Sequence, residues 1–181
     1  MKKILRWFIP VVALLALAAC SKERDARDRY EFDAEWAAAY YYGADALGGV
    51  NSFQLDLAQG RTDEDLDLIS SGAVVRLLIS APLANSIALP DGLYQGSATP
   101  ENAYTFYYGS VQADKSISGS YVGVRTGKQT QFYPIEQGKV SVVAGDGGQY
   151  EIRVEVRTDR KSFSFSYLGA IQTFDCTAKG K

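Results

Sequence analysis

The sequence predicts an all-β fold, specifically an antiparallel β-sandwich, from three observations. Apolar residues recur at every second position in several segments, which is typical of strands with one buried face. Turn signals rich in Gly, Pro and Asp separate these segments. No long segment has the 3.6-residue period of an amphipathic helix. About 160 residues beyond a leader are enough for one domain with a sizeable core.

The N-terminal half contains four predicted strands. In residues 32–42 and 53–57, apolar side chains alternate with smaller or polar ones. Residues 74–79 form a denser apolar segment, and residues 104–108 are aromatic on both faces. The acidic segment between the second and third strands, Thr62 to Ile69, could also form a short helical turn.

The C-terminal half predicts a three-stranded antiparallel meander. Val140 and Val142 lead through the glycine-rich turn "AGDGG" into alternating residues 150–156. The turn "RTDRK" then leads into residues 163–167, where aromatic residues alternate with serines. Residues 121–124 and 130–133 add two weaker strands before the meander.

A lipocalin-like β-barrel is the alternative to a sandwich, because short strands with regular turns are typical of both. Such a barrel normally has a Gly-x-Trp motif early in its first strand. In this chain Trp36 is preceded by Ala34 and Glu35, so the sandwich is favoured.

The first residues have the three parts of an export signal. Lys2, Lys3 and Arg6 precede the apolar residues 7–17, and small residues follow. At roughly 1.5 Å per residue, this apolar segment is too short to cross a hydrocarbon layer of about 30 Å. We therefore predict that residues 1–19 are a signal peptide.

The signal ends on Leu17-Ala18-Ala19-Cys20, which resembles a bacterial lipobox. The resemblance implies that the Cys20 thiol is lipidated and that the protein is attached to a membrane through it. Ser21 stands where an Asp signals retention in the inner membrane, so the resemblance implies the outer membrane. Whether the protein lies on the periplasmic face or on the cell surface is left open.

Three further segments are expected after the signal peptide. Residues 20–33 are predicted to be the lipidated Cys and a charged tether, since ten of the fifteen residues 21–35 are charged. Residues 34–176 are predicted to be the all-β domain, and residues 177–181 a polar tail.

Several short motifs of the mature chain resemble those of small Bacteroidetes outer-membrane lipoproteins of unassigned function. They are the lipobox, "YYG" at 41–43, "LPDGLY" at 89–94 and "IEQGKVSVVAGDGGQYEIRV" at 135–154. The resemblance implies an all-β envelope lipoprotein, and it implies no known reaction.

Composition limits the function classes. Without residues 1–19 the chain has 16 Lys and Arg against 21 Asp and Glu, a net charge of −5, which argues against nucleic acid as a partner. The chain has no His, which removes the usual general base and a common zinc ligand. We predict no catalytic residues and no cofactor, although a hydrolase that uses a pair of carboxylates is left open.

The acidic segment at residues 63–67 and the second cysteine are two weaker candidates for a functional site. Asp63, Asp65 and Asp67 have the first spacings of a calcium loop, but Leu68 and Val74 stand where that loop needs Gly and a bidentate acid. No metal site is predicted, with a looser surface calcium site as the alternative. Cys176 has no partner if Cys20 is lipidated, and a buried small hydrophobe is the commonest role for such a cysteine.

The twelve tyrosines are the best indication of binding. Strand alternation points Tyr41 away from Tyr40 and Tyr42. It likewise points Tyr107 away from Tyr104, Phe106 and Tyr108. We therefore predict Tyr41 and Tyr107 as ligand-contact aromatics, because exposed flat rings can stack on sugars or anchor a partner. The predicted function is a lipid-anchored binding module for a glycan, small ligand or envelope protein, with a structural, assembly or pilus-like accessory subunit as the alternative.

Overall fold

The structure is a computed structural model that describes residues 28–44, 49–63, 67–99 and 102–177. The strands of the first half are β1 (Asp28–Asp33), β2 (Trp36–Ala44), β3 (Asn51–Gln59), β4 (Gly72–Ala81), β5 (Gly92–Ser97), β6 (Thr105–Tyr107) and β7 (Ser110–Val111). The strands of the second half are β8 (Ile117–Ser118), β9 (Tyr121–Thr126), β10 (Gln129–Pro134), β11 (Gln137–Ala144), β12 (Gln149–Arg157), β13 (Lys161–Ala170) and β14 (Gln172–Asp175), with a 3₁₀ turn η1 (Asp146–Gly148).

The prediction of an all-β fold is confirmed. Twelve strands form one mixed sheet in the order β1-β13-β12-β11-β5-β6-β4-β3-β2-β14, with β9 paired to β4 and β10 paired to β9. β7 and β8 form a small second sheet. Most pairs are antiparallel, as expected, but β1 with β13, β5 with β6 and β14 with β2 are parallel.

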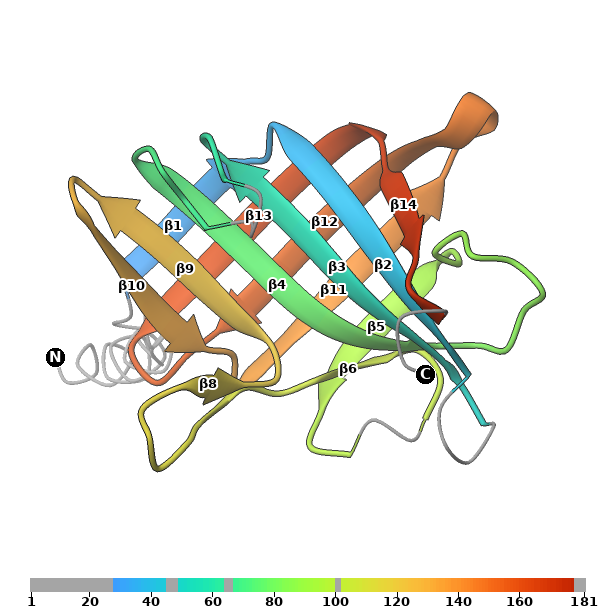
Figure 1. Ribbon diagram of the computed structural model, residues 1–181, viewed down its shortest axis with the longest axis horizontal. Helices are drawn as coiled ribbons and strands as arrows, with labels where there is room; N and C mark the ends of the chain where they lie inside the picture. The colour runs from blue at the N-terminus through green and yellow to red at the C-terminus, as the bar shows by residue number, and fades with distance from the viewer. Residues whose placement is uncertain (1–27, 45–48, 64–66, 100–101, 178–181) are drawn as a thin grey trace, which may run out of the picture.

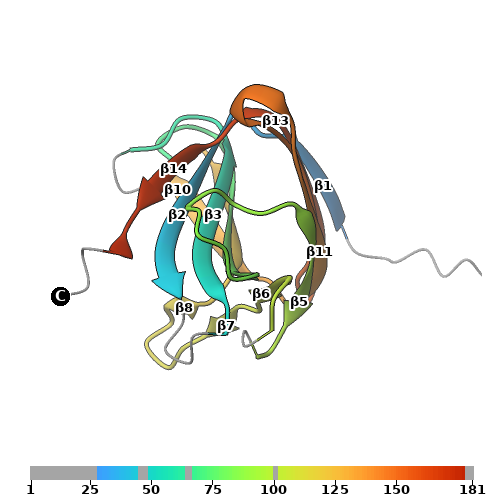
Figure 2. The ribbon, with the colours of Figure 1, turned by 90° about the vertical axis from the view of Figure 1, so that its right-hand side faces the viewer.

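The large sheet folds over itself into two layers. Figure 1 shows β9, β4, β3 and β2 crossing in front of β13, β12 and β11, and Figure 2 shows the two layers as opposite walls. The layers are continuous through β5, β6 and β4. This crossed arrangement is the sandwich that the sequence predicts, because each layer buries its inner face against the other.

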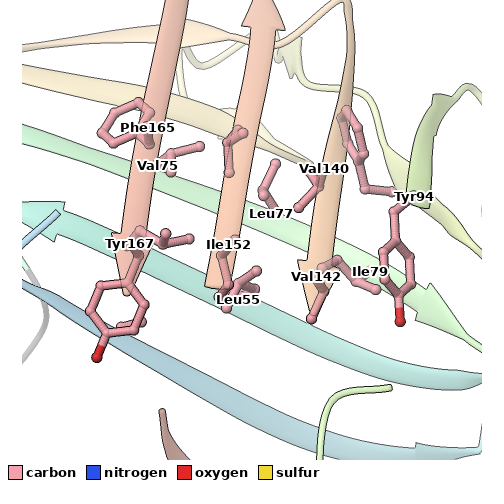
Figure 3. Close-up of a cluster of buried hydrophobic side chains, with 14 of the residues drawn as sticks. Leu55, Val75, Leu77, Ile79, Tyr94, Val140, Val142, Ile152, Phe165 and Tyr167 are labelled. Carbon is pink, nitrogen blue, oxygen red and sulfur yellow. The ribbon is translucent and has the colours of Figure 1, made fainter. Parts of the chain in front are cut away.

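The core lies between the two layers. Leu55 and Leu77 point inward from the front layer toward Val140 and Ile152 of the back layer (Figure 3). All four are fully buried, and in the back layer Val140 faces Val154 across an antiparallel pair. The interior is therefore filled by close-packed aliphatic and aromatic side chains.

The predicted C-terminal meander is present as β11, β12 and β13. Gly147 and Gly148 at the first turn have φ of 68° and 78°, which is the left-handed region that Gly enters at low cost. β12 and β13 then pair over their whole length, from Gln149 with Ala170 to Arg157 with Ser162. The period-two pattern was decisive here, because one face is buried and the other is in solvent.

Part of the expected tether belongs to the sheet instead. Asp28–Asp33 forms β1, which pairs in parallel with β13. Tyr30 and Phe32 pack against Phe163 and Phe165 with ring centroids 5.4 and 5.1 Å apart, while Glu31 between them and the other charged residues of β1 are exposed. The high charge of residues 20–33 suggested a tether, but two inward rings are enough to bind this segment to the domain. Residues 20–27 lie outside the described residues.

Residues 62–69 do not form the optional helical turn in their described part. Thr62 and Leu68 instead pair in an isolated antiparallel bridge. Leu68 packs with Ala58, Val74 and Trp36 in a small cluster on the outer face of the front layer. Across the described residues, no helix has the length and apolar character needed to span a membrane.

Tyr94 links the core to the pH dependence of stability. Its ring is fully buried, its hydroxyl donates to the Pro90 carbonyl oxygen at 2.7 Å, and burial raises its pKa above the usual 10.0. As pH rises, the Tyr94 hydroxyl therefore ionises in the unfolded chain at a lower pH than in the folded protein. The contribution of the buried, protonated hydroxyl to the free energy of unfolding is complete below pH ~10 and is lost as pH rises above it.

We predict that Tyr94→Phe costs about 1 kcal/mol at pH 8, because one hydrogen bond is lost. Between pH 8 and pH 11 the variant should lose less stability than the parent protein, since it has one buried phenol fewer. Urea unfolding at both pH values measures this. An equal fall in the free energy of unfolding for the two proteins would contradict the assignment.

Candidate functional site

A groove of about 370 Å³ crosses the outer face of the front layer, over β3 and β4. Tyr42 of β2 and Tyr107 of β6 lie among its walls, and Ser52, Gln54, Leu78 and Ser80 lie beneath. In Figure 1 these strands form the side of the molecule nearest the viewer.

The strand register places these side chains side by side. Ser52 pairs with Ser80 and Gln54 with Leu78 across β3 and β4, so all four project to the same outer face. Phe53 and Ile79 alternate with them and point into the core. The groove floor is thus the outward half of the same two strands that build the centre of the core.

Two local features place the tyrosine walls. A β-bulge between Tyr41 and Gly43 leaves Tyr42 as an extra residue on β2, and Gly43 has a φ of 90°. On the other side, Ser80 pairs with Thr105 across β4 and β6, which extends the rows of the floor to Tyr107. Tyr42 is 49% exposed, so much of its ring is available to a ligand.

The groove combines apolar surface with a few polar groups and has no charged side chain among its described lining residues. Among the residues that the structure describes, no Asp, Glu, Lys or Arg lines it. Ser52 and Ser80 supply hydroxyls and Gln54 supplies an amide, whose nitrogen donates to Asp56 at 2.8 Å. The Gln54 amide oxygen remains as an acceptor, because it has no hydrogen-bond partner in the described part of the chain.

The aromatic wall continues onto β14. The rings of Tyr40 and Phe174 stack with centroids 5.0 Å apart and an interplanar angle of 11°. The amide of Cys176 donates to the Tyr41 carbonyl oxygen at 2.7 Å, which continues the pairing beyond β14. Phe174 remains 37% exposed, so the groove has an apolar shoulder beside Tyr42.

A buried ion pair between Asp56 and Arg76 lies beside the groove floor, at the next outward-facing pair along β3 and β4. The Arg76 guanidinium donates from Nε to Asp56 Oδ1 at 3.0 Å and from Nη2 to Oδ2 at 3.1 Å. Asp56 is fully buried, whereas the Arg76 side chain is 23% exposed and lies over the Tyr121 ring at 5.5 Å. The two opposite charges cancel, so the ion pair brings no net charge to the surface.

Burial sets the protonation of the groups around the groove. Burial raises the pKa of Asp56, and the hydrogen bonds from Arg76 and Gln54 oppose that rise. Burial lowers the pKa of Arg76, but the hydrogen bonds and charge of Asp56 outweigh it and raise the pKa overall. Burial also raises the pKa of Tyr42, so its hydroxyl is a proton donor at neutral pH.

The structure separates the two predicted ligand-contact tyrosines. Tyr107 lines the groove, whereas Tyr41 points inward, where its ring lies 5.1 Å from Phe53 and its hydroxyl donates to Asn51 at 3.4 Å. Alternation correctly places Tyr40 and Tyr42 on the face opposite Tyr41, but sequence reasoning took Tyr41 as the outward ring, so Tyr42 was missed. The Gly that follows the three tyrosines is the signal of the bulge, since Gly is common at bulges.

The remaining predicted positions fall elsewhere. Cys20 lies outside the described residues, and Cys176 is a free, partly exposed thiol. Asp63 and Asp67 are joined by a backbone hydrogen bond, and the Asp67 amide also donates to the Asp63 carboxylate at 2.9 Å; Asp65 lies outside the described residues. In the described ranges, no cluster of three or more His, Cys, Asp or Glu could hold a metal ion.

Comparison with protein-family models, with curated proteins and with solved structures finds no match to this chain. A function for the protein is therefore inferred from its residues and from the geometry of the groove.

We predict that Asp56→Ala destabilises the protein by about 2–3 kcal/mol, because it leaves Arg76 partly buried without its counter-ion. The double variant Asp56→Leu/Arg76→Met should cost less than the single one, since both charges are removed together. Urea unfolding of the three proteins measures this. A double variant less stable than Asp56→Ala would show that the charges themselves are needed.

Proposed function

We propose that this protein is a lipid-anchored, non-catalytic binding module of the bacterial cell envelope, and that its groove holds a neutral glycan. The observation that carries this proposal is the pairing of Tyr42 and Tyr107 across an uncharged polar floor. A pyranose ring has apolar C–H faces and equatorial hydroxyls, and so it suits aromatic walls above a floor of hydrogen-bonding groups.

The floor provides both donors and acceptors for sugar hydroxyls. Ser52 and Ser80 can each donate and accept, and the Gln54 amide oxygen can accept. The absence of charge among the described lining residues favours hexoses over sugars that carry carboxylate or sulfate. A charged sugar would lose its hydration without gaining a counter-ion.

The same geometry supports binding rather than hydrolysis. A hydrolase with two carboxylates needs both of them in contact with the scissile bond. The acid nearest the floor is Asp56, which is fully buried and already bonded to Arg76 and Gln54. The Asp56 carboxylate thus already accepts hydrogen bonds from structural partners beneath the groove.

The lipobox supports the anchored location. If Cys20 is lipidated, seven residues, that is eight Cα–Cα steps, separate it from the start of β1 at Asp28. At about 3.3–3.6 Å per extended residue they span at most roughly 30 Å. The proposed site is the outer membrane, on its periplasmic or its outer face, with the start of β1 held within that distance of the bilayer.

The sheet edges favour a binding module over a strand-exchanging subunit. β1 is an edge strand, and Asp28, Arg29, Glu31 and Asp33 along it are exposed charges. Charges on an edge strand oppose pairing with another chain. A subunit that polymerises through its N-terminal strand would need the opposite pattern.

We predict that Tyr42→Ala and Tyr107→Ala each weaken glycan binding about tenfold or more, because each removes one aromatic wall. An array of neutral and acidic bacterial glycans identifies the ligand for the parent protein, and titration calorimetry measures the change in its affinity.

The matched control is Phe132→Ala, which removes a ring that is 45% exposed on β10, in the same layer but outside the groove. Its affinity should equal that of the parent protein. An equal loss in this control, or binding restricted to acidic glycans, would rule out the groove as a neutral-glycan site.

We also predict that Cys20→Ala abolishes incorporation of labelled fatty acid and releases the protein from the membrane fraction, since a thiol is needed for the anchor. Cys176→Ala is the matched control and should be labelled like the parent protein. Undiminished labelling of the Cys20 variant would overturn the proposed anchor.

A further inference from the structure

A second cavity, of about 160 Å³, opens at the end of the sandwich where β1 and β13 meet β9 and β10. Tyr30 and Lys161 come from the back layer, and Val124, Gln131 and Tyr133 come from the front layer. Figure 1 shows β1, β9 and β10 at this end of the molecule. The cavity shares no lining residue with the tyrosine groove, as far as the described residues go.

Lys161 places an ammonium group between two aromatic rings. Its Nζ lies 4.6 Å from the centre of the Tyr30 ring and 5.1 Å from that of Tyr133. Nζ also donates to the Tyr30 hydroxyl at 3.0 Å. An ammonium has three donors, so this arrangement orients the group and leaves N–H capacity for a ligand.

In the described part of the chain, no carboxylate lies within the 4.0 Å of an ion pair from the Lys161 ammonium, although Asp28 aligns with Lys161 across β1 and β13. Among the described residues that line the cavity, Lys161 is the one charged side chain. The chain has more acidic than basic residues, so an acidic neighbour would be the ordinary expectation for a cation. The hydrogen bond to Tyr30 raises the pKa of Lys161, so the group is cationic throughout the physiological range.

Three aromatic rings form one side of the cavity, and Thr126, Gln129 and Gln131 give it a polar side. Phe163, which is 1% exposed, lies 5.4 Å from Tyr30 and 5.5 Å from Tyr133 between ring centroids. Its volume of about 160 Å³ is large enough for a benzene-sized body. The cavity therefore combines one cation with space for one small flat or apolar group.

We propose that this cavity binds a small carboxylate with a flat or apolar body, with the carboxylate on Lys161 and the body between Tyr30, Tyr133 and Phe163. The ligand supplies the anion that the described protein residues do not. An N⁺–H···O⁻ hydrogen bond is stronger than its neutral equivalent, which makes the carboxylate the main determinant of recognition.

Benzoate is the probe, and benzyl alcohol is its neutral counterpart. We expect ¹⁵N and methyl chemical shifts of the full chain to move saturably with benzoate, with the changes concentrated at Val124, Gln131 and Phe163. Benzyl alcohol should bind at least about tenfold more weakly, because it lacks the charge-assisted hydrogen bond.

Lys161→Met should weaken benzoate binding about tenfold or more, whereas Tyr42→Ala should leave it unchanged, which separates this site from the proposed glycan groove. Lys161→Arg keeps the charge and should retain measurable binding if Lys161→Met unfolds. No saturable shifts with benzoate, shifts located at another surface, or equal binding of benzyl alcohol would overturn the proposal.

Discussion

The hydrogen-bonded register between β3 and β4 is the constraint on which the rest of the structure depends. The two strands pair from Asn51 with Ala81 to Gln59 with Ala73. One face of this pair carries Leu55 and Leu77 into the core, and the other carries the groove floor and the Asp56–Arg76 ion pair. A slip of one residue would turn buried leucines to solvent and charges to the core.

The outer face of this strand pair is covered unevenly, and the groove lies in the part left open. At one end Leu68 covers Ala58 and Val74, and in the middle Arg76 covers Asp56. Toward the other end, small and polar side chains lie low between taller aromatic ones. The groove thus forms because short side chains lie beside long ones on a continuous sheet. No separate loop is needed to form it.

Sequence patterns predicted the strands in which apolar residues recur at every second position, so that one face is buried and the other is in solvent. The meander from Val140 to Tyr167 is such a case, because inward apolar residues alternate with outward residues that are mostly polar. β1 was missed since its charges outnumber its two inward rings, Tyr30 and Phe32. The parallel pairing of β1 with β13 joins segments far apart in sequence, which no local pattern encodes. Tyr107 was predicted in the candidate site, but Tyr42 was missed because alternation shows which tyrosines share a face and does not show which face is buried.

The first and last strands of the described fold both depend on distant partners, and this sets the order in which the fold can be completed. Asp28 aligns with Lys161, so β1 has no partner until almost the whole chain has been made. β14 joins β2, which leaves the front layer without its last strand until the C-terminal residues arrive. Contacts of such long sequence separation slow folding. During synthesis from the N-terminus, β1 would therefore stay exposed and unpaired until β13 has been made, which leaves a strand edge open to wrong partners for most of that time.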